Sequence, residues 1–309
     1  MSRLLKFPAG NNFANAINSA IKKGVSVQII STNFSNLTPI EGNYQKELYS
    51  GSILTDLMIC DNKNFIMASS IYDTDFIEKN DVIGIYVKDT ELINVDAKRF
   101  FEIIWESLNT DGIKELSSLR MSYDLLARTM STSPCQIGKS SLYFSQSPYS
   151  YYPLNRDLTS TRLGAEIKLA STQMLISTST IKLNPSYEST TNIIARAIKG
   201  AQVNVLLSNN SEINNSLISS SYIAGVPGIN VRVSNKNVNL PDYIVIDGST
   251  VIFASTPVSN DILTRNPGLM LTAYKTTIAS ELIDMFNEEW NNSLPFKDFA
   301  DIPFPPDKN

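Results

Sequence analysis

The stretch LPDYIVIDGSTVIFAST, Leu240–Thr256, decides the fold, because the stretch LTDLMICDNKNFIMASS, Leu54–Ser70, repeats its pattern. Each begins with Leu-x-Asp, continues with an apolar run and reaches a second Asp at a polar turn. Each then ends with another apolar run and Ala-Ser. Two apolar runs joined by a tight polar turn predict a β-hairpin. The chain therefore contains the same predicted hairpin twice.

The segments on either side of the two hairpins are repeated as well. AINSAIKKGVSVQIIST, Ala16–Thr32, precedes the first hairpin, and NIIARAIKGAQVNVLLSN, Asn192–Asn209, precedes the second. Each predicts an amphipathic helix, a glycine that ends it, and a strand with alternating apolar residues. After each hairpin comes an apolar stripe at helical spacing that contains one of the two tryptophans, Trp105 and Trp290. These tryptophans are predicted to pack in the core.

The order helix, strand, hairpin, helix thus occurs twice, which predicts an α/β fold with two lobes built as α/β/α sandwiches. The predicted lobes are residues 1–133 and 134–309. The second lobe has room for an additional helix near Ser160–Ala170 and an additional strand near Met174–Thr180. In the first lobe only Arg3–Phe7 could supply such a strand, so this lobe is predicted to be shorter.

A sheet edge exposed by this shortening is expected to be covered by the N-terminal segment or by another subunit. Between the lobes, a helix is predicted over Gly112–Met130, followed by an irregular connection rich in Ser, Pro and Tyr. Tyrosine is enriched at protein interfaces, so this connection is a candidate interaction loop through Tyr149, Tyr151 and Tyr152.

The composition of the 309-residue chain excludes several reaction classes. It contains no histidine, which excludes Ser-His-Asp catalysis and imidazole metal ligands. No apolar run is long enough for a transmembrane helix. The net charge of −4 argues against non-specific nucleic-acid binding. We expect no cofactor and no metal centre.

The two hairpins resemble the catalytic motif of the phospholipase D superfamily, H-x-K-x4-D followed by G-[ST]-x-N. The second half, Asp242–Ser293, is similar to the branch that contains the lysosomal phospholipase D-like exonucleases and their poxviral relatives. The segment YFSQSP, Tyr143–Pro148, resembles the start of the second domain in that branch. The resemblance covers nearly the whole chain and implies a two-lobed phospholipase D-like α/β/α fold.

In the first half, the aspartate of the motif matches Asp61. The histidine position is then Leu54 and the lysine position is Asp56. The serine and asparagine positions are Ser69 and Ile71.

The second half departs from the motif in the same way. Its aspartate matches Asp247, while Leu240 holds the histidine position and Asp242 the lysine position. Ser255 and Pro257 hold the serine and asparagine positions.

These departures imply a pseudoenzyme. In the family, one histidine attacks phosphorus, the other donates a proton, and the lysines and asparagines bind phosphate oxygens. Leucine can do neither of the histidine's tasks, and aspartate repels a phosphodiester. The expected function is binding, scaffolding or structural support through a protein partner or self-association.

The Asn-, Ile- and Ser-rich composition is typical of AT-rich genomes. Together with the poxviral resemblance, it favours a large DNA virus as the source. A role in virion assembly or partner binding, in the host cytoplasm or in the virion, follows by analogy.

Two alternatives use the remnant cleft around Asp56 and Asp242. One is a cation site, with Asp61 or Asp247 nearby as a further ligand. The other is a groove that binds lipid or nucleic acid without hydrolysis, and peripheral membrane association stays open. The simpler interpretation is that Asp56 and Asp242 are solvated or paired with Lys or Arg, while the two turn aspartates cap backbone N–H groups.

Overall fold

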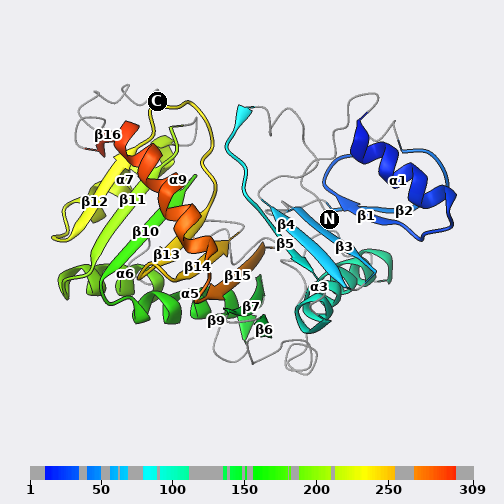
Figure 1. Cartoon of the computed structure of the whole chain (residues 1–309), viewed down its shortest axis with the longest axis horizontal. Coiled ribbons are helices and arrows are strands. Elements are labelled where there is room, and N and C mark those ends of the chain that lie inside the picture. The colour runs from blue at the N-terminus through cyan, green and yellow to red at the C-terminus, as the bar shows by residue number, and fades with distance from the viewer. Residues whose placement is uncertain are drawn as a thin grey trace. The chain divides into compact units, whose positions relative to one another are not determined.

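The computed structural model of the chain forms two compact units, which are described separately (Figure 1). Unit 1 comprises Met1–Thr159 and Ile262–Leu271, and unit 2 comprises Ser160–Asp261 and Thr272–Asn309. The predicted lobe boundary after residue 133 lies outside the described residues. The structure describes residues 11–34, 40–49, 56–61, 63–68, 79–88, 91–110, 135–137, 140–147, 150–151, 156–179, 181, 188–209, 213–254 and 268–296.

Unit 2 contains six neighbouring strands of a larger mixed sheet, in the order β16-β12-β11-β10-β13-β14. Neighbouring strands are parallel among β10, β11 and β12, and antiparallel from β10 through β13 to β14 and between β12 and β16. The strand bounds are β10 Gln173–Thr178, β11 Gln202–Leu207, β12 Ile229–Val233, β13 Tyr243–Ile246, β14 Thr250–Ala254 and β16 Leu294–Pro295.

Helices cover both faces of this sheet. Helix α6 contacts β11 and α7 contacts β12, while α9 contacts β10, β13 and β14. Figure 1 shows α9 running across the strands of the sheet, with α5 and α6 next to each other. The helix bounds are α5 Leu158–Leu169, α6 Glu188–Ile198, α7 Ile213–Ala224 and α9 Ile278–Asn292. Unit 2 is therefore the predicted α/β/α sandwich.

The central strands of unit 2 are buried on both faces. Every residue of Val203–Leu207 is buried, although the sequence alternates only in part. The polar member of this run, Asn204, is 8% exposed, and its Oδ1 accepts a hydrogen bond of 3.0 Å from Nδ2 of Asn230 on β12. A parallel sheet with helices on both faces requires this double burial.

Unit 1 carries the corresponding elements in shorter form. Strands β1 and β2 are parallel, and β3, β4 and β5 form an antiparallel three-stranded sheet. Asn11 caps α1, since its Oδ1 accepts hydrogen bonds from the N–H groups of Phe13 and Ala14 at 2.8 and 3.3 Å. The bounds are α1 Asn12–Lys22, β1 Gln28–Ser31, β2 Gln45–Leu48, β3 Asp56–Cys60, β4 Asn64–Ala68, β5 Gly84–Lys88 and α3 Glu91–Thr110.

Both predicted hairpins are present and share an unusual turn. Three residues join β3 to β4 and β13 to β14, and the first of them is Asp61 or Asp247. These two aspartates have positive φ angles of 52° and 49°. Aspartate is one of the few residues other than glycine that tolerate this conformation. The repeat is therefore visible in backbone geometry as well as in sequence.

The described part of unit 1 has no counterpart of β10. In unit 2, β10 joins β11 to β13. Among the described strands of unit 1, the equivalent strands β1 and β3 belong to separate sheets. The segment Arg3–Phe7, predicted to fill this place, lies outside the described residues, as does the predicted helix Gly112–Met130.

The predicted irregular connection between the lobes is wrong in part, because it contains strands. Strands β6 and β7 pair antiparallel, and β8 pairs with β9. The Ser- and Pro-rich composition hid the short run Leu142–Phe144 in SSLYFSQS, which contains two aromatic residues of high strand propensity. The bounds are β6 Cys135–Ile137, β7 Ser140–Ser147, β8 Ser150–Tyr151 and β9 Arg156–Asp157.

The two tryptophans are half-buried rather than fully buried in the core. Trp105 stacks on Phe101 with ring centroids 5.9 Å apart, and Trp290 stacks on Phe286 at 5.4 Å. The Arg232 guanidinium lies 5.5 Å from the Trp290 ring centroid and is held by hydrogen bonds to Ser293. This contact ties the end of α9 to β12.

Candidate functional site

The candidate site lies in unit 2 at the edge where parallel strands β10 and β11 end and the chain enters β13. In open α/β sheets, ligands bind outside the carboxyl ends of the strands. Leu240 and Asp242 are the motif positions of this hairpin that reach the edge. Leu240 is buried, with 5% of its surface exposed, and its N–H donates to Ser208 Oγ at 2.7 Å. Its side chain offers no reactive group to this edge.

Asp242 is held by the residues that follow β10. One of its oxygens accepts the Ser179 N–H at 2.7 Å, and the other accepts the Ser179 hydroxyl at 3.4 Å. Burial raises the pKa of Asp242 to about 7, while hydrogen bonds from Ser179 and Thr178 act in the opposite direction. Near neutral pH the carboxyl group is therefore only partly ionised. The two donors at 2.7 and 3.4 Å belong to Ser179, which directly follows β10, and among the described residues no Lys or Arg side chain pairs with Asp242.

Hydroxyl groups dominate the surroundings of Leu240 and Asp242. The Ser177 hydroxyl donates to the Pro241 carbonyl at 2.7 Å, and the Ser208 hydroxyl lies 3.5 Å from the Thr178 carbonyl. We call Ser177, Ser179 and Ser208 the hydroxyl cluster. It anchors the segment that enters β13 to the ends of β10 and β11. The sequence interpretation missed these serines, although the run of hydroxyl residues at 177–180 was a visible signal.

Asp247 lies at the opposite end of the hairpin and is structural. Its carboxylate accepts hydrogen bonds from the N–H groups of Ser171, Thr172 and Gln173 at 2.8 to 3.2 Å, and from the hydroxyls of Ser171 and Thr172. Partial burial alone would raise the pKa of Asp247, but these bonds outweigh it and hold the pKa well below its usual range. The capped N–H groups belong to the start of β10, not to the turn of Asp247 itself.

This separation removes Asp247 as a cation ligand beside Asp242. Five residues of extended chain span roughly 17 Å, so the two carboxylates face opposite ends of the sheet. Within the described residues, no group of three or more His, Cys, Asp and Glu side chains could hold a metal ion. The alternative cation site with Asp247 as a neighbour is therefore wrong for unit 2.

The corresponding positions of unit 1 are only partly described. Asp56 begins β3 and is buried, with 2% of its surface exposed. Asp61 is exposed at the hairpin turn. Tyr151 belongs to β8. The other predicted site residues lie outside the described part of the chain: Leu54, Ser69, Ile71, Tyr149, Tyr152, Ser255 and Pro257.

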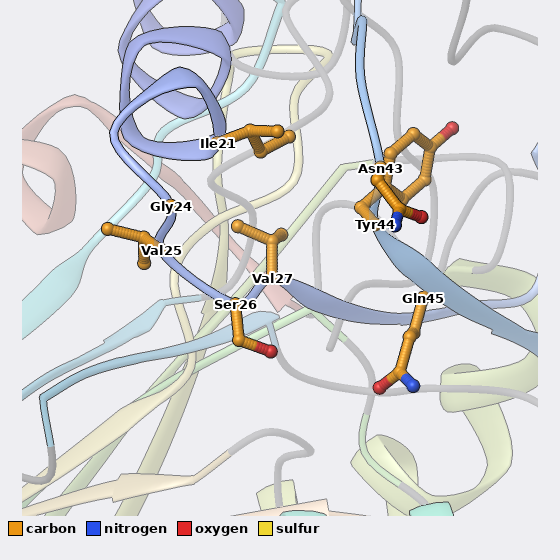
Figure 2. Close-up of a pocket in the computed structure, with 8 residues that line it drawn as sticks. All are labelled: Ile21, Gly24, Val25, Ser26, Val27, Asn43, Tyr44 and Gln45. Atoms are coloured by element: carbon orange, nitrogen blue, oxygen red, sulfur yellow. The ribbon is translucent and has the colours of Figure 1, made fainter.

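A pocket of about 460 Å³ lies in unit 1, and none of the predicted site residues lines it (Figure 2). It is formed where α1 ends and where β1 and β2 begin. Figure 2 shows the amide ends of Asn43 and Gln45 and the ring of Tyr44 across from Val25 and Val27. None of its lining residues is charged: Ile21, Gly24, Val25, Ser26, Val27, Asn43, Tyr44 and Gln45.

Comparison with known proteins gives a family match in the second half of the chain. Residues 163–290 match the family described as cardiolipin synthase, PLD-like domain. A search of curated proteins gives no match.

Two solved structures, a phosphatidylserine synthase and a polyphosphate kinase, share the fold over nearly the whole chain. Phosphatidylserine synthase from Haemophilus influenzae is 10% identical over 95% of this chain and 81% of that one, with a TM-score of 0.62. Polyphosphate kinase from Porphyromonas gingivalis is 11% identical, with a TM-score of 0.57, over 96% of this chain and 45% of the kinase. The phospholipase D family member Nuc from Salmonella typhimurium matches 51% of this chain and 98% of its own, at 18% identity and a TM-score of 0.43.

Within the described residues, no helix is both long and apolar enough to cross a membrane.

Proposed function

We propose that the chain is a member of the phospholipase D superfamily that acts by binding rather than by catalysis, and the match over residues 163–290 together with the shared fold supports this proposal. The observation that carries this proposal is the pair Leu240 and Asp242 at the motif's histidine and lysine positions. Leu240 is buried, and Asp242 is bonded to Ser179. The chain has no histidine elsewhere that could replace the lost one.

The chemistry of the site supports this proposal. Attack on phosphorus needs a nucleophile, and Leu240 has none. The Ser179 hydroxyl meets Asp242 at 3.4 Å, which is a weak contact for proton transfer. A carboxyl group that is partly ionised at neutral pH also repels a phosphodiester anion where a lysine would attract it. The buried Asp56 repeats this substitution in unit 1.

In its finer form, the proposed function is scaffolding or structural support through a protein partner or self-association. By analogy with the poxviral relatives, we place it in virion assembly or partner binding, in the host cytoplasm or in the virion. The support for this setting is the resemblance and the composition of the sequence.

The alternative of a cation-dependent module gains no support from the described site. The Ser179 donors occupy both oxygens of Asp242, and burial favours its neutral form. A calcium or magnesium ion prefers ionised, accessible carboxylates.

Phosphodiesterase assays test the proposal. We expect bis(p-nitrophenyl) phosphate, single-stranded DNA and phosphatidylglycerol vesicles to be hydrolysed no faster than in buffer, next to an active family enzyme as positive control. Turnover that Asp242→Asn abolishes and that the exposed α9 variant Asp284→Asn leaves intact would overturn the proposal. A melting temperature raised by calcium or magnesium in the wild type but not in Asp242→Asn would favour the cation module instead.

A further inference from the structure

The ends of three helices lie along one edge of the unit 2 sheet, opposite the edge that carries Leu240 and Asp242. Leu169 is the last residue of α5, Ile198 is the last residue of α6, and Tyr222 lies in the last turn of α7. Each of these helices returns the chain to the start of the next parallel strand. The three helix ends therefore lie where β10, β11 and β12 begin.

Direct contacts make these ends one continuous surface. The Asn192 side chain of α6 donates to the Gly164 carbonyl of α5 at 2.8 Å, so the two helices are neighbours. Leu169 and Ile198 follow these residues by five and six positions, which brings them to a similar level along the helix axes. The turn before β12 touches the end of α6, because a Cβ atom on Gly228 would lie 2.9 Å from the Ala197 carbonyl oxygen.

This surface exposes apolar side chains. Leu169 and Ile198 are each 68% exposed, the highest value among the large apolar residues described, and Tyr222 is 56% exposed. Single exposed apolar residues are normal on protein surfaces. Three on adjacent helix ends form a patch of the kind that marks an interaction site.

The surface also carries two exposed lysines. Lys168 and Lys199 adjoin Leu169 and Ile198 in the sequence and are exposed. Among the described residues, neither lysine forms an ion pair. The nearby carboxylate of Asp247 accepts hydrogen bonds from the N–H groups at the start of β10, and Glu281 lies in the first turn of α9, which contacts β10, β13 and β14. The side chains of Lys168 and Lys199 are therefore available to bind an anionic partner at this edge.

We propose that this surface, Lys168, Leu169, Ile198, Lys199 and Tyr222, docks the protein onto an anionic lipid bilayer. Leucine and isoleucine enter the boundary between headgroups and acyl chains, and the tyrosine ring lies at headgroup level. The two lysines contact acidic headgroups. A bilayer receives projecting aliphatic side chains without a complementary pocket, whereas a nucleic acid gains little from leucine and isoleucine. The edge with Leu240 and Asp242 then points away from the lipid.

Vesicle co-sedimentation of the full chain tests this docking. We expect binding to vesicles of phosphatidylcholine with 30% phosphatidylserine, and weak binding to phosphatidylcholine alone. A lysine near an anionic surface contributes about 1 kcal/mol, roughly fivefold in affinity, so Lys168→Gln with Lys199→Gln lowers partitioning about 25-fold. Leu169→Ser with Ile198→Ser abolishes it.

Matched controls use exposed residues elsewhere in the chain. Met285→Ser removes a side chain of α9 that is 45% exposed, and Lys22→Gln with Lys23→Gln removes two exposed lysines at the end of α1. Both controls are expected to partition at least half as well as the wild type, with unchanged melting temperatures.

Equal wild-type binding to both vesicle types would overturn the proposal, and so would unchanged binding of either double variant. Binding of single-stranded DNA that the lysine variant loses and the Leu169/Ile198 variant keeps would assign the surface to nucleic acid and also overturn it.

Discussion

Asp242 and Asp247 lie five residues apart on one hairpin, yet the pKa of Asp242 is raised and the pKa of Asp247 is lowered. Burial dominates at Asp242 and raises its pKa to about 7. At Asp247, three backbone N–H groups and two hydroxyls hold the pKa below its usual range despite partial burial. Near neutral pH, the same residue type is thus a partly ionised group at one end of the sheet and an ionised cap at the other.

The raised pKa of Asp242 makes the protein less stable as the pH increases. Between pH 3.8 and about 7 the folded state keeps a proton that the unfolded state has released, so stability falls across this window. Asp242→Asn removes the titration and preserves the acceptor for the Ser179 N–H.

We therefore expect the free energy of unfolding of Asp242→Asn, relative to that of the wild type, to be about 1–3 kcal/mol higher at pH 8 than at pH 5. Urea unfolding at the two pH values measures this difference. A stability difference between Asp242→Asn and the wild type that is the same at both pH values would contradict the raised pKa of Asp242.

Asp247→Asn is expected to destabilise unit 2 by about 2 kcal/mol at pH 7, because it weakens charge-assisted hydrogen bonds to the start of β10. The loss should shrink as the pH falls below 3.8, where the free carboxyl group protonates. Asp61→Asn is the matched control, because Asp61 has a positive φ similar to that of Asp247 and an exposed side chain. Its effect should stay within about 0.5 kcal/mol in the same unfolding experiment. Equal losses in both variants would mean that the turn conformation, and not the cap, explains the effect.

The spacing Leu-x-Asp-x4-Asp predicted which residues occupy the motif positions. The expectation that Asp247 caps backbone N–H groups holds for the groups at the start of β10, which lie outside its own turn. The sequence did not reveal that Ser177, Ser179 and Ser208 surround Leu240 and Asp242. Their contacts join residues 32 to 64 positions apart. Such contacts depend on how β10 is aligned with β13 and β11, and no local pattern encodes that alignment.

Among the elements, the hairpins and amphipathic helices were predictable, because each carries its own periodicity. Strands β6 to β9 were not, since a composition of Ser, Pro and Tyr predicts loops more strongly than the short run Leu142–Phe144 predicts a strand. The parallel order β12-β11-β10 was expected only as a fold class. The strand order itself depends on long-range pairing.

The turn between α7 and β12 needs glycine for two separate reasons. Gly228 has a φ of 86°, and a Cβ atom there would approach the Ala197 carbonyl oxygen to 2.9 Å. Gly200 has a φ of 102° but no heavy atom within 4 Å of its Cβ position. Gly200→Ala is therefore expected to cost about 1–2 kcal/mol from backbone strain alone.

Gly228→Ala should cost about 2–4 kcal/mol, because displacement of α6 adds to this strain. Thermal unfolding of the two variants measures the difference. Equal costs would show that α6 and the turn are packed more loosely than the contact indicates.

For the whole molecule, β2 of unit 1 differs from the central strands of unit 2 in how deeply its residues are buried. All residues of β13 and most of β10 and β11 are buried, whereas no residue of β2 is. Strands buried on both faces open only in large unfolding events, while exposed strands open locally.

We accordingly expect backbone amides of Leu175–Ser177 and Val205–Leu207 to exchange at least about 100-fold more slowly than those of Lys46–Leu48. Hydrogen–deuterium exchange with mass spectrometry measures this on the intact chain. Comparable rates in the three segments would mean that the units open together.

The way the chain divides between the two units has a consequence for its synthesis on the ribosome. Unit 1 comprises Met1–Thr159 and also Ile262–Leu271. The ribosome adds this second segment only after the intervening part of unit 2. At roughly 5–20 residues per second, these hundred or so residues delay the last piece of unit 1 by about 5–20 s. Throughout that interval the nascent first unit is incomplete. The contacts that Ile262–Leu271 makes with the rest of unit 1 can therefore form only after most of unit 2 has been synthesised.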